Sequence, residues 1–287
     1  MGGVSPSREM KGSVRSVEQI IGYRFKNKRL LEEALTHSYS SSSGADSLSY
    51  QRLEFLGDAV ISLAISRYFF DEYPQLKPGE LSDLREAYVS NEKLARVAVR
   101  HDLYEYIRRF NVKSLDDQVK KFTEAVRGKD DEVLYDAPVV APDILADIVE
   151  SIAAAVYHDV DFDLKRVWMI LKDLLKPIPI RTIEDLEKYK HPVKKLFDLC
   201  RKQGKKVQIK HRSDGSETVA NVYIDGGLFE SASSDQKEIA RRSAAKSALL
   251  KLSPSRSNNV DEVSEIEDDS KANGFVYEKQ AQELLVP

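Results

Sequence analysis

The sequence predicts a protein of two domains, an all-α domain followed by a smaller α+β domain. Before about residue 190, apolar residues recur at helical spacing and almost no strand pattern appears. Over residues 191–252, the pattern becomes helix, three strands and helix. The 287 residues are 41% apolar, which is enough to bury a sizeable core and excludes a wholly disordered chain.

The all-α domain consists of helical patterns separated by breaks. A polar, Gly- and Ser-rich arm covers residues 1–15, and residues 40–49 form a Ser-rich loop. Residues 50–70 carry one long apolar helical pattern, and Pro142 stands where the helix DILADIVESIAAAVYHD can begin. The remaining helical patterns lie at 17–25, 27–37, 81–103, within 111–140 and at about 162–175.

The α+β domain is predicted to have the order α-β-β-β-α. Its first helix is PVKKLFDLCRKQ, and its last helix is KEIARRSAAKSALLKL. Between them, KVQIKHRS, TVANVYID and LFESAS alternate or carry β-branched residues, with Asp-Gly and Gly-Gly turns. The predicted boundaries are an arm at 1–15, the all-α domain at 16–160, a helix and linker at 161–190, the α+β domain at 191–252, and an acidic, disordered tail at 253–287.

The net charge of −3 is unevenly distributed along the chain. Residues 1–190 carry 28 basic and 32 acidic side chains, residues 191–252 carry 13 and 7, and residues 253–287 carry 3 and 8. A basic module between two acidic parts indicates an anionic partner for that module.

The composition also indicates where the protein acts. Cys200 is the single cysteine, so no intramolecular disulfide and no cysteine zinc site can form, which fits a reducing compartment. The N-terminal residues have no apolar signal segment, and no apolar run is long enough to span a bilayer. We therefore expect an intracellular protein, in the nucleus, the cytoplasm or both, without a membrane partner. We expect Cys200 itself to be a small buried residue.

Two pairs of carboxylates stand in apolar helical segments. Glu54 and Asp58 are four residues apart, and Asp147 and Glu150 are three apart, so each pair shares a helix face. Burying unpaired acids is costly, and a divalent cation such as Mg²⁺, which prefers oxygen ligands and binds phosphates, removes that cost. Two such ions can hydrolyse a phosphodiester. The alternative is a solvated stripe or a salt bridge, for which Arg52 is the nearest cation.

The amino-acid sequences of these two segments are more specific than the spacing of their acids. QRLEFLGDAV resembles the signature of the ribonuclease III family, and LADIVESIAAAVY resembles its second acidic motif. GYRFKNKRLLEEALTHSY and LSDLREAYVSNEKLA resemble two further family segments, so the resemblance covers about residues 16–160. It implies an all-α endonuclease domain of the ribonuclease III type. It also implies that four acids are catalytic and bind Mg²⁺, with Mn²⁺ as a substitute: Glu54, Asp58, Asp147 and Glu150.

The resemblance also implies a reaction and an assembly. The expected function is endoribonuclease cleavage of double-stranded RNA by two metal ions, leaving 5′-phosphate and 3′-hydroxyl ends with short 3′ overhangs. One catalytic domain cuts one strand, so a homodimer is implied, with Phe55 inserted into a socket of the partner domain. No small-molecule substrate is expected. The alternative is a non-catalytic RNA-binding scaffold, or a partner of a Dicer-like complex.

The sequence departs from the bacterial pattern of the family at two outer acids. Gln51 and Pro78 stand at those positions, as in the Dicer and plant branch, and the chain is most similar to plant ribonuclease III-like proteins. These substitutions concern the outer-sphere metal ligands and leave the four central acids in place. His37 and His101 are expected to be structural or exposed, because two-metal hydrolysis needs no histidine base.

The basic α-β-β-β-α module resembles a double-stranded-RNA-binding domain over about residues 192–252. Such domains recognise the shape of A-form RNA through its 2′-hydroxyls and phosphates. Glu238 interrupts the family's basic string and Asp214 and Glu217 lie in the first β-loop, so we expect weaker RNA binding than in strong members. The alternative is a basic surface for protein contacts. The residues expected to contact RNA are Lys194, Lys195, Asp198, Lys202, Arg212, Lys237, Arg241 and Arg242.

Overall fold

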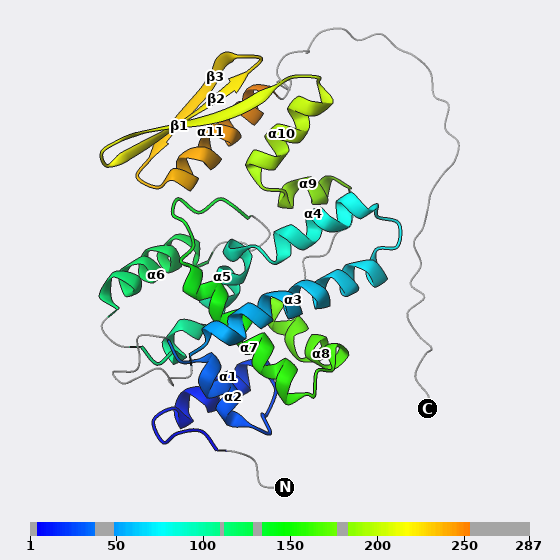
Figure 1. Ribbon diagram of the computed structural model, residues 1–287, viewed down its shortest axis with the longest axis vertical. Coiled ribbons are helices and arrows are strands. Elements are labelled where there is room, and N and C mark those ends of the chain that lie inside the picture. Colours follow the sequence, from blue (N-terminus) through cyan, green and yellow to red (C-terminus); the bar gives the residue numbers. More distant parts are fainter. Residues whose placement is uncertain (1–4, 38–48, 110–111, 129–133, 177–182, 253–287) are drawn as a thin grey trace, which may run out of the picture. The chain divides into compact units, whose positions relative to one another are not determined.

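The computed structural model describes residues 5–37, 49–109, 112–128, 134–176 and 183–252 (Figure 1). It confirms the predicted fold class, a helical domain followed by an α+β domain. The predicted acidic tail and most of the Ser-rich loop lie outside these residues. The helical domain contains α1 (Lys11–Ile21), α2 (Lys28–Ala34), α3 (Gln51–Glu72), α4 (Pro78–Tyr88), α5 (Asn91–Arg100), a 3-10 turn (Leu103–Tyr106), α6 (Lys113–Val126), α7 (Asp143–Asp159) and α8 (Leu164–Leu175).

Helix α7 is the centre of the helical domain. Its side chains are buried on nearly all sides, from Ile144 to Val156, as its almost continuous apolar sequence requires. Helices α2, α3, α5 and α8 pack around it (Figure 1). A polar side chain in the middle of α7 therefore lies either in the core or at a seam between α7 and a neighbouring helix.

Helices α3 and α7 cross at unusually close range at Gly57. A Cβ atom at this position would lie 1.8 Å from the carbonyl oxygen of Glu150, a distance that no pair of unbonded atoms can adopt. Only glycine, which has no side chain, permits this approach. The crossing therefore places the residues on either side of Gly57 directly beside Glu150.

The N-terminal arm is shorter than the predicted 1–15. Helix α1 begins at Lys11, and Met10 and Val14 belong to the buried core. Val14, Val17 and Ile21 share one face at helical spacing, so the helix gains apolar burial by extending toward the N-terminus.

The predicted helix at 81–103 is two helices, α4 and α5. The chain leaves helical geometry at Ser90, whose hydroxyl accepts a hydrogen bond of 3.3 Å from the backbone N–H of Lys93. Serine is a preferred N-cap because its side chain satisfies such an otherwise unpaired donor. The predicted linker also contains a short helix, α9 (Ile183–Tyr189).

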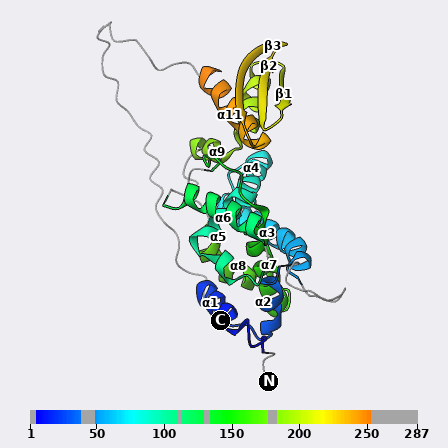
Figure 2. The same cartoon turned by 90° about the vertical axis from the view of Figure 1, so that its left-hand side faces the viewer.

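The α+β domain follows the predicted order, α10 (Pro192–Lys202), β1 (Val207–Asp214), β2 (Glu217–Ile224), β3 (Gly227–Ser234) and α11 (Lys237–Leu252). The three strands form one antiparallel sheet in sequence order, and α11 packs against it (Figure 2). Helix α10 packs against α11 (Figure 1). The Asp225–Gly226 turn has positive φ at both residues, as a tight hairpin requires. Small residues on α11, including Ala240, Ala244 and Ala248, allow close packing around the buried Cys200.

Among the described helices, none combines the length and hydropathy needed to cross a membrane.

We predict that Gly57→Ala destabilises the protein by roughly 1–3 kcal/mol or more, because α3 and α7 must separate to admit the new methyl group. Chemical denaturation measures this change. Gly12→Ala is the matched control, since Gly12 lies in α1 with open space around its Cβ position, and it should be neutral or stabilising by up to about 1 kcal/mol. Equal stability of the Gly57→Ala variant and the wild type would contradict the close crossing.

Candidate functional site

The α3–α7 crossing brings together acids from both predicted pairs. One carboxylate oxygen each from Glu54, Asp147 and Glu150 lies within 4.8 Å of the others. Glu54 projects from the first turn of α3, and the other two project from successive turns of α7. Residues about 95 positions apart in the sequence are adjacent here because Gly57 lets the two helices approach.

Asp58 borders the same site without joining this tight group. It is exposed, one turn after Glu54, and its negative charge acts on Glu150. All four predicted acids line one open cavity of about 660 Å³. The complete lining is Tyr50, Gln51, Glu54, Phe55, Leu56, Asp58, Ala59, Val89, Asn91, Asp143, Asp147 and Glu150.

Asp147 and Glu150, the two predicted acids on α7, both have raised pKa values. Burial, followed by the negative charge of Asp58, raises the pKa of Glu150 to about 8. Burial also raises the pKa of Asp147 to about 6, although the hydrogen bond from Tyr50 opposes this shift. Without a cation, a carboxylate at such a site favours its protonated form.

Within the part of the chain that the structure describes, no basic side chain pairs with these acids to relieve the repulsion. Among the described residues, no Lys or Arg lies within salt-bridge distance of the four acids, so the predicted alternative of a salt bridge to Arg52 is not found. The charge of Arg52 instead acts on Glu33. Converging carboxylate oxygens and an open cavity, with no competing cation among the described side chains, suit a hard divalent ion.

Hydrogen bonds orient two acids at the cavity. The hydroxyl of Tyr50 donates to Oδ2 of Asp147 at 3.1 Å. The side-chain amide of Asn91 donates to Oδ1 of Asp143 at 2.8 Å. Sequence reasoning did not identify Tyr50, Asn91 or Asp143. Asp143 stands one turn before Asp147, and this i, i+4 spacing was the available signal.

Phe55 lies beside the acids and faces solvent. Its side chain is 81% exposed, which is unusual for a large apolar residue next to a buried helix face. Leu63 and Phe70 are also exposed farther along α3. The helix thus presents apolar side chains on its outer surface, as expected for a surface that a partner covers.

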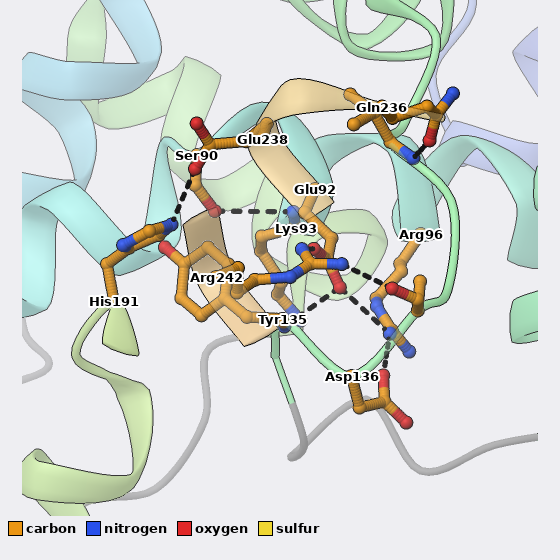
Figure 3. A network of polar contacts seen from close by, with 12 residues as sticks. Ser90, Glu92, Lys93, Arg96, Tyr135, Asp136, His191, Gln236, Glu238 and Arg242 are labelled. Atoms are coloured by element: carbon orange, nitrogen blue, oxygen red, sulfur yellow. Dashed lines mark hydrogen bonds and ion pairs between the residues drawn. The ribbon is translucent and has the colours of Figure 1, made fainter. Parts of the chain in front are cut away.

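The eight predicted RNA-binding residues differ in their surroundings. Three are exposed: Lys202, Arg212 and Lys237. Four are partly buried: Lys194, Lys195, Asp198 and Arg241. Arg242 is buried, and it forms an ion pair with Glu92 of the helical domain (Figure 3).

Comparison with known proteins assigns both domains. Residues 51–161 match the Ribonuclease III domain, and residues 192–252 match the Double-stranded RNA binding motif. "Ribonuclease 3-like protein 2" from Arabidopsis thaliana is 51% identical over 87% of this chain, which spans 62% of that relative's length. The protein of the same name from Oryza sativa subsp. japonica is 47% identical over 82% of this chain and 74% of its own length.

A solved nuclease domain of ribonuclease III from Campylobacter jejuni is 30% identical, with a TM-score of 0.45. The alignment covers 58% of this chain and 99% of that chain, and that structure is described as flexible in a region involved in dimer formation. The plant matches cover most of this chain, and one domain assignment falls on each of the two domains. The chain therefore belongs to the ribonuclease III family.

Proposed function

We propose that this protein is an endoribonuclease that cleaves double-stranded RNA with the help of divalent cations. The observation that carries the proposal is the convergence of Glu54, Asp147 and Glu150 within 4.8 Å at an open cavity. The Ribonuclease III domain and the Double-stranded RNA binding motif in the same chain support it. The proposed place of action is intracellular.

The acids would hold Mg²⁺, or Mn²⁺ in its place. Such ions, when bound, lower the pKa of a coordinated water and neutralise charge on the phosphate. Glu54, Asp147 and Glu150 are the proposed direct ligands, and Asp58 is proposed at the open side of the cavity. Tyr50 keeps one oxygen of Asp147 occupied, so that the carboxylate presents its other oxygen in a constant direction.

The described residues supply one such site, and cutting both strands requires two. We propose a homodimer in which the exposed Phe55 enters the partner subunit. The proposed products carry 5′-phosphate and 3′-hydroxyl ends with short 3′ overhangs. The α+β domain is proposed to bind the duplex through its exposed cations, including Lys202, Arg212 and Lys237.

Glu150→Gln should reduce Mg²⁺-dependent cleavage of a labelled perfect RNA duplex by at least about 100-fold, the scale of removing one preorganised charged group. Glu72→Gln is the matched control, because Glu72 is an exposed acid at the far end of α3 and should cleave like wild type. Cleavage resolved on a denaturing gel, with EDTA as the metal-free reference, measures both. Binding of the duplex by the wild type without any cleavage would favour the RNA-binding scaffold instead.

The raised pKa of Glu150 predicts a pH-dependent cost in the metal-free protein. An unfolded Glu ionises near pH 4.5, whereas the folded carboxyl keeps its proton to about pH 8, so stability falls as pH rises through this window. In EDTA, Glu150→Gln should therefore unfold at a higher temperature than wild type at pH 8, with the difference shrinking toward pH 5.

Calorimetry of both proteins checks this sign. Adding Mn²⁺ at pH 8 should raise the melting temperature of the wild type more than that of the variant, because binding the folded state stabilises it. If Glu150→Gln were less stable than wild type in EDTA at pH 8, the ionised Glu150 carboxylate would be stabilised by protein groups in the absence of a cation, and the prediction would be wrong.

Phe55→Ala should weaken the homodimer by roughly 2 kcal/mol, about 30-fold in its dissociation constant, if the side chain is a central anchor. Light scattering after size-exclusion chromatography measures the monomer fraction. Leu250→Ala is the matched control, since Leu250 is equally exposed but lies on α11. Wild-type protein that stays monomeric at micromolar concentration would refute the homodimer.

A further inference from the structure

The basic α+β domain is held against the helical domain by a buried ion pair. Nη1 of Arg242 on α11 lies 2.8 Å from Oε2 of Glu92 on α5, and the two side chains are only 7% and 6% exposed. Arg242 also donates to the carbonyl oxygen of Ala137. An unpaired guanidinium would not remain in such a place, so Glu92 is what allows Arg242 to be buried.

Glu92 is prepared for this contact by its own domain. Its Oε1 accepts from Arg96 at 3.0 Å and from the backbone N–H of Tyr135 at 2.8 Å, which leaves Oε2 directed at Arg242 (Figure 3). A carboxylate held by two donors loses little further freedom when a third arrives. The carboxylate of Glu92 is therefore fixed by its own domain in the orientation that accepts from Arg242.

Further hydrogen bonds surround the ion pair. The ammonium group of Lys246, one turn after Arg242, donates to the carbonyl oxygen of Tyr135 at 2.5 Å. The backbone N–H of Val140 donates to Oε1 of Gln236 at 2.8 Å. The segment before α7 thus contributes both acceptors and a donor to the same contact.

A second acidic position receives the first helix of the α+β domain. Lys194 on α10 lies 2.9 Å from Asp83 on α4 and also pairs with Glu86. Lys190, just before α10, lies 3.1 Å from the same Asp83. Asp83 has a lowered pKa, mainly because the hydrogen bonds from Lys194 and Lys190 outweigh its burial.

These contacts occupy part of the surface that we expect to bind RNA. Lys194 and Arg242 are two of the predicted RNA contacts, and neither can bind RNA through donors that are already bound to carboxylates. Lys202, Arg212 and Lys237 remain exposed, so a duplex can still approach the domain. The same cations cannot serve both partners at once.

We propose that Asp83, Glu86 and Glu92 form a docking surface for the α+β domain of the same chain, and that double-stranded RNA competes with this surface for Lys194 and Arg242. The inference rests on the proposed function, because it requires the α+β domain to bind RNA. The docked arrangement is the RNA-free state, and duplex binding releases the domain from the acids.

The double variant Asp83→Asn/Glu86→Gln tests the competition without altering any RNA-binding residue. It should bind an RNA duplex about 3- to 10-fold more tightly than wild type at moderate salt, the range expected for losing three partly exposed ion pairs, those of Lys194 with Asp83 and Glu86 and that of Lys190 with Asp83. Fluorescence anisotropy with a labelled duplex, in EDTA to prevent cleavage, measures the affinity. Small-angle scattering of the full chain without RNA should show a larger radius of gyration.

The control must remove the same charge elsewhere, because any loss of negative charge favours RNA. Asp117→Asn/Glu124→Gln does so on the exposed face of α6, and it should change affinity much less. Lys246→Gln provides an independent arm, since it removes a docking hydrogen bond from a residue outside the predicted RNA contacts. It should also tighten RNA binding, although it removes a positive charge.

Equal affinities in wild type, the Asp83→Asn/Glu86→Gln variant and the Lys246→Gln variant would overturn the competition. Equal tightening in the α6 control would overturn it as well, by reducing the effect to net charge. A wild type that binds no duplex under any condition would instead refute the proposed function, so the two failures are distinguishable.

Discussion

The close crossing of α3 and α7 at Gly57 is the constraint on which the site depends. The two helices carry their acids on facing surfaces, and a Cβ at Gly57 would collide with the backbone of Glu150. With that approach, Glu54 lies beside Asp147 and Glu150, although the two helices are separated by about 70 residues of chain. Without it, the same acids would be two unrelated pairs on separate helices. Packing of the core and assembly of the site are therefore one event.

The crossing also brings negative charges close together, and a bound cation would reduce their repulsion. An apolar helix buried on nearly all sides carries two acids at its edge, and burial raises the pKa of both. If these acids bind a cation as proposed, stability and function oppose each other here, because removing a carboxylate would relieve repulsion and also remove a proposed ligand. Tyr50 adds order to this arrangement, because its hydrogen bond limits the conformations of the Asp147 carboxylate.

The basic α+β domain has two possible anionic partners. Its cations can pair with carboxylates of the helical domain or with phosphates of a duplex, and both interactions use the same donors. A buried ion pair such as that of Arg242 and Glu92 is specific, since it forms only when the surrounding hydrogen bonds also fit. Exposed cations elsewhere on the domain contribute long-range attraction to RNA without being committed to either partner.

Local patterns were sufficient to predict the two domains, the order of nearly all elements and the two helices on which the four acids lie. Helical periodicity, strand alternation and residue-specific motifs are short-range properties, so they can be read from the chain. They did not predict that one helix ends and another begins at Ser90, because the apolar pattern continues through this residue and a serine can either cap a helix or lie within one. Nor could they assign Tyr50, Asn91 or Asp143 to the cavity, or pair Arg242 with Glu92 across 150 residues. The sequence by itself thus determined the secondary structures and which acidic side chains they carry. Only the tertiary structure decided which of them meet, because contact between distant segments depends on how closely the helices pack, and a single glycine sets that distance.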